Sequence, residues 1–159
     1  MDASRRPGFA REDLRLRYDA RQVSEDNWHT FTDSVTQSVL ARHLHSRRFN
    51  NTDWVLNAGA GVTELHPAWA AEVSLDLFAA PIENRQYPVC GSVTQLPFRS
   101  ETFSAVVCVG EVLAYCDPHE AFEEFARVMR HGGMLICDFG STKSWLRVQF
   151  SGAPKFAPG

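Results

Sequence analysis

Two segments of this 159-residue chain have residue types and spacing suited to holding a small polar ligand. Asn57-Ala58-Gly59-Ala60-Gly61 directly follows a short apolar run, and its glycines allow positive φ and close approach of the backbone to a ligand. Asp76 ends the next apolar run. A carboxylate in that place can accept hydrogen bonds from the two hydroxyls of a ribose. The pattern therefore predicts a nucleoside-type site, and the alternative for Asp76 is a solvated turn residue.

The glycine segment differs from the fingerprint of dinucleotide-binding proteins. In G-x-G-x-x-G the third glycine would fall at position 64, where this chain has Glu64. A carboxylate there would repel a pyrophosphate, whereas it suits a ligand with a cationic or zwitterionic end. A nicotinamide oxidoreductase is disfavoured further because the only lysines, Lys143 and Lys155, offer no catalytic Tyr-Lys pair.

Composition and charge exclude several other classes of protein. Sixteen Lys and Arg against nineteen Asp and Glu give a net charge of −3, without the basic excess typical of nucleic-acid binding. No apolar run reaches the roughly 18 residues of a membrane-spanning helix, and the N-terminus has no apolar signal segment. We therefore expect a cytoplasmic protein that binds neither nucleic acid nor a membrane.

The four cysteines, Cys90, Cys108, Cys116 and Cys137, form no C-x-x-C pair, and three of them lie in apolar segments. This distribution favours reduced thiols in the core over a metal site or a framework of disulfides.

Hydrophobic periodicity predicts three helices. The first runs from Ser24 to Arg48, with an apolar stripe of Trp28, Phe31, Val35, Val39, Leu40 and Leu44. A short one is predicted over 63–71. The third follows the N-cap Asp117, with Pro118 at its first position, and ends at His131-Gly132-Gly133. Its predicted buried stripe is Phe122, Phe125, Ala126 and Met129.

Short apolar runs alternate with these helices and predict strands over 54–56, 73–76, 88–93, 103–109 and 134–139. Parallel strands need crossover connections. The order therefore predicts an α/β, doubly wound, mostly parallel five-stranded Rossmann-like sheet with helices on both faces. The ligand crevice of such a sheet lies at the carboxyl ends of the strands, here residues 57–63, 76–78, 91–93 and 109–116. The expected organisation is a flexible N-terminus (1–13), a helical cap (14–50), a cofactor-binding core (51–140) and an irregular tail (141–159).

Four segments in this order resemble the class I S-adenosylmethionine-dependent methyltransferases, in particular those that modify small molecules. WVLNAGAGVTEL is similar to their glycine-rich first motif, and SLDLF to the acidic end of their second strand. CGSVTQLPFRSETFSAVVCVGEVLAYC resembles their adenine-binding turn, Leu-Pro-Phe loop and fourth strand, and EEFARVMRHGGMLICDF their helix leading into the fifth strand. The resemblance covers residues 52–140.

The resemblance implies S-adenosylmethionine as cofactor and assigns roles to individual residues. Glycines 59 and 61 would pass beneath its methionine part, Asp76 would hold the ribose, and Leu77 would pack on the adenine. Ser92 and Val93 would face the adenine edge, and the backbone at Ala58, Val109 and Gly110 would contact the amino and carboxyl groups. The full implied cofactor set is Asn57, Ala58, Gly59, Ala60, Gly61, Thr63, Asp76, Leu77, Ser92, Val93, Val109 and Gly110.

The substrate pocket implied by the resemblance begins at Glu111 and Tyr115. Tyr18 and Trp28 are candidate lid residues, with core packing as their alternative role. Methyl transfer from a sulfonium needs alignment and exclusion of water more than a dedicated catalytic group. No general base is assigned; the candidates are His119, Glu111, Tyr115 and His29, and His119 is better explained as a residue in the first turn of its helix.

The chain departs from the family pattern in several places. Asn57 replaces the usual acid, Thr63 the third glycine of the motif, Ser92 the usual aspartate of the adenine turn, and Ser104 the usual aspartate at the start of the fourth strand. The sequence after the fifth strand is too short for the usual sixth and seventh strands.

An exposed apolar fifth strand tends to pair with another chain. We therefore expect a homodimer, a partner subunit, or a truncated form whose missing part carries the wall of the substrate pocket. The leading hypothesis is a methyltransferase that transfers a methyl group to a small-molecule acceptor. The alternative is a catalytically inactive methyltransferase-like subunit that acts by association.

Overall fold

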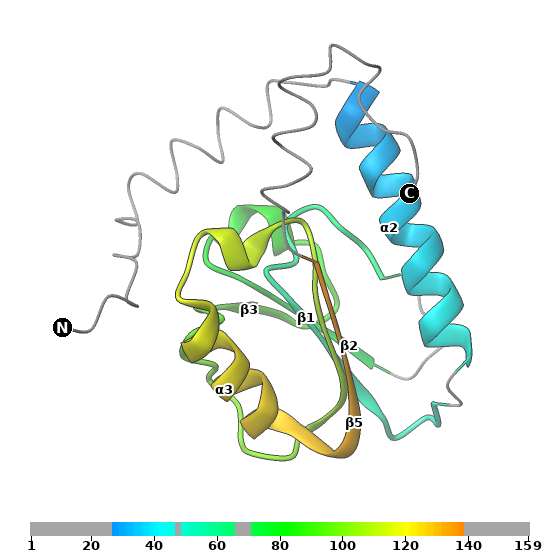
Figure 1. The fold of residues 1–159 in the computed structure, drawn as a ribbon. Helices are drawn as coiled ribbons and strands as arrows, with labels where there is room; N and C mark the ends of the chain where they lie inside the picture. Colours follow the sequence, from blue (N-terminus) through cyan, green and yellow to red (C-terminus); the bar gives the residue numbers. More distant parts are fainter. Residues whose placement is uncertain (1–26, 47–48, 66–70, 139–159) are drawn as a thin grey trace, which may run out of the picture.

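A computed structural model describes residues 27–46, 49–65 and 71–138. Its centre is a five-stranded parallel sheet (Figure 1) of strands β1 (Trp54–Ala58), β2 (Ala71–Asp76), β3 (Pro88–Cys90), β4 (Phe103–Cys108) and β5 (Met129–Cys137). The strand order is β3-β2-β1-β4-β5, and every neighbouring pair is parallel. The order reverses beside β1, as in a doubly wound sheet, so the predicted fold class is confirmed.

Helices cover both faces of the sheet. Figure 1 shows α2 (Asn27–Ser46) on one side and α3 (Pro118–Val128) on the other. Successive residues of a strand point to opposite faces, so β1 sends Val55 toward α2 and Leu56 toward α3. The α2-side core contains Leu40, Leu44, Val55, Leu65, Ala105, Val107 and Val109. The α3-side core includes Leu56, Leu75, Phe103, Val106, Phe125 and Val128.

Helix α3 begins where the sequence predicts and ends earlier. Asp117 Oδ1 accepts a hydrogen bond from the His119 amide at 2.9 Å, as an N-cap should. The helix ends at Val128 rather than at His131, because the chain enters β5 directly at Met129, which pairs with Phe103. The carbonyl of Val128 accepts the Thr102 amide at 2.7 Å, so this early end leaves no orphan acceptor there. His131-Gly132-Gly133 lies within β5, where the register with β4 shifts.

The predicted apolar stripes of both long helices need correction. In α2, Leu40 and Leu44 are buried, whereas Val35 and Val39 are 45% and 44% exposed. The side chains of Trp28 and Phe31 lie outside the described residues. In α3 the buried residues are Ala121, Phe125 and Val128. Of the other predicted residues, Ala126 is exposed, Phe122 is 39% exposed and Met129 is half-buried in β5. Phe122 instead packs edge-on against the Phe125 ring, with centroids 6.1 Å apart.

Several other predicted boundaries also change. Residues 63–65 are not helical, and the rest of the predicted 63–71 helix lies outside the described residues apart from Ala71, which begins β2. Strand β3 stops at Cys90 instead of residue 93, because the chain turns at Val93 and Thr94, between the bridged residues Ser92 and Gln95. Two short 3-10 helices, η1 (Ala80–Ile82) and η2 (Val112–Ala114), follow β2 and β4.

Candidate functional site

The carboxyl ends of β1, β2 and β3 are joined by backbone hydrogen bonds. The amides of Gly59 and Ala60 both donate to the Leu75 carbonyl, at 2.8 and 2.9 Å. The Gly91 amide donates to the Asp76 carbonyl at 2.8 Å. Parallel pairing of β1 with β4 brings the end of β4 to the same edge. The predicted crevice segments therefore lie together, as the topology requires.

The bend after β1 needs glycine at its first turn. Gly59 has φ +73°, and a Cβ built there would lie 2.5 Å from Val112 Cγ2. A side chain at this position is excluded twice, by the backbone conformation and by the contact with the segment after β4. Gly61 also has a positive φ, +47°. The bend therefore packs closely against the segment after β4, and its approach to a ligand stays a prediction.

The amides of this bend are used inside the protein. Gly59 and Ala60 bond to Leu75, the Gly61 amide donates to Asp76 Oδ2 at 2.9 Å, and the Thr63 amide donates to the Ala60 carbonyl at 2.9 Å. A phosphate cradle instead presents a row of free amides to its anion. This arrangement agrees with the exclusion of a pyrophosphate and favours a ligand that itself donates hydrogen bonds.

Asp76 is held in a fixed orientation at the end of β2. Its side chain is buried, with 7% relative exposure, and Oδ1 accepts the Phe78 amide at 2.9 Å while Oδ2 accepts the Gly61 amide. A carboxylate has about four acceptor positions, so these two bonds leave capacity for two hydroxyl donors. The glycine bend and the carboxylate therefore form one hydrogen-bonded unit.

Asn57 is buried beneath the bend, with 1% relative exposure. Its Nδ2 donates to the Thr63 carbonyl at 3.0 Å and to Glu72 Oε1 at 2.9 Å. The Thr63 carbonyl also accepts Arg85 Nη2 at 3.2 Å, and Arg85 Nη1 lies 2.7 Å from Glu64 Oε1. Glu72 and Arg85 were not predicted. The alternation of β2 could have placed Glu72 beside Asn57, but nothing in the sequence indicates Arg85.

The predicted adenine turn has its own hydrogen bonds. Ser92 Oγ lies 2.9 Å from Thr94 Oγ1 and accepts the Thr94 amide at 3.2 Å, and the Ser92 carbonyl accepts the Gln95 amide. Val93 is buried in the α3-side core, and Leu77 is half-buried. The Ser92 hydroxyl thus stabilises the turn, and its contact with a nucleobase remains a prediction.

The loop that follows this turn is fastened to α3. Arg127 donates from Nη1 to the Phe98 carbonyl at 2.8 Å and from Nη2 to the Leu96 carbonyl at 3.0 Å. Glu124 Oε2 accepts the Leu96 amide at 2.6 Å. The hydrogen bond from Arg127 holds the pKa of Glu124 below its ordinary value, and the same bond raises the pKa of Arg127. Neither residue was predicted to support the site.

The segment after β4 is held by an aspartate at the end of β5. The amides of Gly110 and Glu111 donate to Asp138 Oδ2 at 2.9 Å and Oδ1 at 3.0 Å. Both residues have positive φ, +85° and +62°. The predicted ligand contact of Gly110 therefore cannot use its amide without competing with Asp138. Asp138 was not predicted, although an acid ending the strand next to β4 was a usable signal.

The remaining predicted site residues differ in how deeply they are buried. Val109 is buried, Glu111 is exposed as the N-cap of η2, and Tyr115 is half-buried at its end. His119 lies in the first turn of α3, 81% exposed in its side chain, with Nδ1 3.4 Å from Glu123 Oε1. Tyr18 and the side chains of Trp28 and His29 lie outside the described residues.

The cysteines show no bonded pair. Cys108 and Cys137 are register partners on β4 and β5, and burial raises the pKa of both thiols. Burial also raises the pKa of Cys116 to about 11. Cys90 is exposed, and its Sγ lies 3.3 Å from the Leu77 carbonyl. Among the described residues, no group of three His, Cys, Asp or Glu could hold a metal ion.

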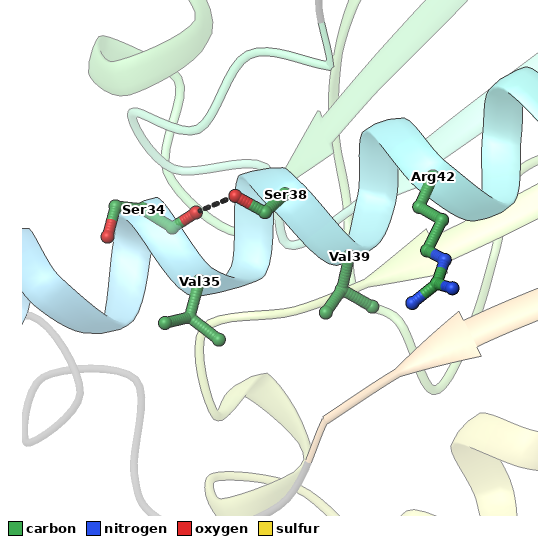
Figure 2. Close-up of a pocket in the computed structure, with 5 residues that line it drawn as sticks. All are labelled: Ser34, Val35, Ser38, Val39 and Arg42. Carbon is green, nitrogen blue, oxygen red and sulfur yellow. Dashed lines mark hydrogen bonds between the residues drawn. The ribbon is translucent and has the colours of Figure 1, made fainter. Parts of the chain in front are cut away.

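A surface hollow lies elsewhere, on α2. Figure 2 shows Ser34, Val35, Ser38, Val39 and Arg42 lining it, all from this single helix. Ser38 Oγ donates to the Ser34 carbonyl at 2.8 Å, so the hydroxyl is engaged within the helix. None of the predicted cofactor residues borders this hollow.

Within 27–46, 49–65 and 71–138, no helix is long and apolar enough to cross a membrane.

The fold and this edge define a class of protein. A doubly wound parallel sheet, with a glycine bend after β1 and an acid at the end of β2, is a Rossmann-like nucleoside-binding architecture. The family model described as "Methyltransferase domain" matches residues 56–137, from within β1 to the end of β5. The chain belongs to this methyltransferase-domain family.

Curated relatives agree over the same region. A demethylmenaquinone methyltransferase of Mycolicibacterium paratuberculosis is 37% identical over 82 residues, which are 50% of this chain and 36% of that protein. A malonyl-[acyl-carrier protein] O-methyltransferase of Herminiimonas arsenicoxydans is 46% identical over 48 residues, 30% of this chain and 18% of that protein. The chain therefore aligns with well under half the length of each of these relatives.

Solved structures show the same fold. A protein from Pyrococcus horikoshii has a TM-score of 0.62 at 19% identity, covering 77% of this chain and 63% of that one. The geranyl diphosphate C-methyltransferase of Streptomyces coelicolor, crystallised with S-adenosyl-L-homocysteine, has a TM-score of 0.58 at 21% identity, covering 66% and 45%. At sequence identities of 19% and 21%, this similarity establishes the fold of the chain and no more.

Proposed function

We propose that this protein is an S-adenosylmethionine-dependent methyltransferase that transfers a methyl group to a small-molecule acceptor. Family membership over residues 56–137 supports the reaction class. The names of the demethylmenaquinone and geranyl diphosphate methyltransferases give small-molecule substrates, and the second was crystallised with S-adenosyl-L-homocysteine, the demethylated cofactor. The observation that carries the proposal is the hydrogen bond between the Gly61 amide and Asp76, which makes the bend and the carboxylate one unit.

The site residues fit an adenosyl sulfonium in their chemistry. Asp76 keeps acceptor capacity for two ribose hydroxyls. Gly59, whose Cβ position is occupied by Val112, permits the bend that brings the Gly61 amide to Asp76. Leu77, Ser92 and Val93 would border the adenine, and the carbonyls near Ala58, Val109 and Gly110 would face the methionine part. Ala60, Gly61 and Thr63 would complete the contacts, and Asn57 would support them from beneath the bend.

The bound cofactor supplies the electrophilic methyl group, and the protein's part is to align the acceptor and exclude water. Glu111 and Tyr115 flank η2, directly after the β4 end, and would border the acceptor. Tyr18 is the candidate lid residue. No described histidine or carboxylate is assigned as a general base, because in-line displacement on a sulfonium does not require one.

Calorimetric titration with S-adenosylhomocysteine tests the proposal. We expect the wild-type chain to bind at micromolar concentration, and Asp76→Ala to weaken binding by about tenfold or more, since hydrogen bonds to a charged group contribute about 1.5–3 kcal/mol. Glu101→Gln, which removes an exposed carboxylate away from the edge, is the matched control. A folded wild-type protein that shows no heat of binding at millimolar ligand would contradict the proposal and favour an inactive subunit.

The edge of the sheet suggests a homodimer. Among the described strands β5 has a partner on one side only, and Met134, Leu135, Ile136 and Cys137 are half-buried. An apolar strand with one unpaired edge tends to pair with another chain. We propose a cytoplasmic homodimer, with the cofactor-binding core at 51–140 and the helical cap at 14–50. Light scattering coupled to gel filtration should give twice the mass of the chain; a monomeric mass at high concentration argues against the dimer.

A further inference from the structure

The Thr63 carbonyl lies outside the described helices, and even a helix continuing from it would offer it no donor. In an α-helix the carbonyl of residue 63 accepts the amide of residue 67. Residue 67 is a proline, which has no amide hydrogen. A buried or half-buried carbonyl must then find another donor. The Thr63 carbonyl finds two, Asn57 Nδ2 at 3.0 Å and Arg85 Nη2 at 3.2 Å.

The amide nitrogen of Asn57 therefore donates to two acceptors. One acceptor is the Thr63 carbonyl, and the other is Glu72 Oε1 on the neighbouring strand β2. Glu72 Oε1 also accepts Ser74 Oγ at 3.2 Å, which fixes the carboxylate. An asparagine amide supplies two N–H donors, whereas an ionised aspartate supplies none. At 1% exposure, water cannot substitute for the missing donors.

We infer that Asn57 is a positioning residue that fixes the exit of the glycine bend, and that Glu72 is the partner that selects asparagine at this position. Its binding consequence rests on the proposed function. Asn57 and Thr63 lie at the two ends of the bend, and Gly61 between them holds Asp76. A change at Asn57 therefore reaches the cofactor through the bend and Asp76, without a direct contact.

A four-protein cycle tests this inference: wild type, Asn57→Asp, Glu72→Gln, and the double variant. Each is measured for thermal unfolding without ligand and for S-adenosylhomocysteine affinity. In Asn57→Asp two carboxylates meet at a distance that was 2.9 Å, and the Thr63 carbonyl loses a donor. We expect a lower melting temperature and binding weakened by about tenfold or more. In the double variant the side-chain amide at position 72 donates to the carboxylate at position 57, whereas the Thr63 carbonyl still lacks its donor from position 57. We therefore expect affinity and melting temperature to lie between those of Asn57→Asp and wild type.

The opposite results would overturn the inference. If residue 57 contacted the cofactor's ammonium directly, Asn57→Asp should bind the ligand more tightly than wild type, whatever residue is at position 72. A double variant no more stable and no tighter than Asn57→Asp would show that Glu72 does not select the residue at 57. Glu83→Gln, an exposed charge removal after η1, should leave the effect of Asn57→Asp unchanged.

If Asn57→Asp does not fold, a second pair keeps the test decisive. Glu72→Gln retains an oxygen acceptor for Asn57, whereas Glu72→Ala removes it. We expect Glu72→Ala to lower the ligand affinity and the melting temperature more than Glu72→Gln does. Equal values for the two variants would overturn the inference. Failure of the proposed function is distinguishable, because the coupling between 57 and 72 is then still present in the melting temperatures although no protein of the set binds the ligand.

Discussion

Arg127 and Glu124 form a two-point ion pair one turn apart on α3, with Nε 2.6 Å from Oε1 and Nη2 2.8 Å from Oε2. The same two side chains bond to the backbone of Leu96 and Phe98. Because Leu96 follows the predicted adenine turn, this pair connects α3 to the candidate site through the loop.

Replacing Arg127 should loosen that loop. Arg127→Ala removes the donors of two loop carbonyls and leaves Glu124 without its partner, so we expect a loss of about 2–3 kcal/mol in the free energy of unfolding. Arg127→Lys should lie between alanine and wild type, since lysine keeps the charge without the planar fork. Chemical denaturation gives the values. Arg99→Ala, an exposed residue of the same loop, is the control, and a loss as large as that of Arg127→Ala would contradict this account.

The contact between Gly59 and Val112 predicts a partial suppressor. Gly59→Ala places a Cβ within 2.5 Å of Val112 Cγ2 and at φ +73°, and the backbone conformation alone costs about 1–2 kcal/mol. We expect weaker ligand binding and a lower melting temperature. Val112→Ala should restore part of the loss in the double variant, because it removes the clash and leaves the φ penalty. Complete restoration would show that only the clash with Val112 matters, and no restoration would show that only the positive φ does.

Asp138 is expected to affect the acceptor side more than the cofactor side. Asp138→Asn offers one oxygen to two amides, so Gly110 or Glu111 loses a partner while both keep positive φ. Once an acceptor is identified, we expect its KM to rise by about tenfold with a smaller change in cofactor affinity, since one hydrogen bond to a charged group is lost. Equal losses for both ligands would place Asp138 in a general structural role.

Asp53 gives the molecule a pH-dependent stability. Its carboxylate accepts Ser104 Oγ at 2.5 Å, the Asn50 amide at 2.8 Å and Arg130 Nη1 at 3.1 Å. The Ser104 hydrogen bond, followed by the Asn50 amide, lowers the pKa of Asp53 from its ordinary value of 3.8. The unfolded chain then binds the proton more readily, so this stabilisation is complete above about pH 4 and is lost as the pH falls through the lowered value.

Asp53→Asn should therefore be less stable than wild type at neutral pH and should lose less stability between about pH 5 and pH 2. Urea denaturation across that range measures both effects. Some slope remains in the variant, because the pKa of Glu124 is lowered as well. A variant whose stability falls in parallel with wild type would show that Asp53 does not contribute.

The sheet and its edge were predictable because they rest on strong local patterns. Continuous apolar runs ending in glycine or aspartate mark buried parallel strands, and Asp117-Pro118 marks the start of α3. The exposed Val35 and Phe122 were mistaken for core because each helix packs on one side only, and a wide apolar stripe does not indicate which part of it makes the contact.

The supports of the site were not predictable in the same way. Glu72, Arg85, Glu124 and Asp138 act through hydrogen bonds between segments distant in sequence, and such partners leave no periodic pattern. Two signals were usable nonetheless. The alternation of β2 places Glu72 on the same face as Asn57, and Asp138 follows the strand next to β4. Neither signal indicates which backbone or side-chain group the carboxylate binds.

The exposed thiol of Cys90 gives this protein a natural attachment point for a fluorescent label. Cys108, Cys116 and Cys137 have raised pKa values and ionise little at neutral pH, so a maleimide dye should modify Cys90 first. Cys90 pairs in register with Asp76, so the dye would sit at the rim of the candidate crevice and report ligand arrival as a change in emission.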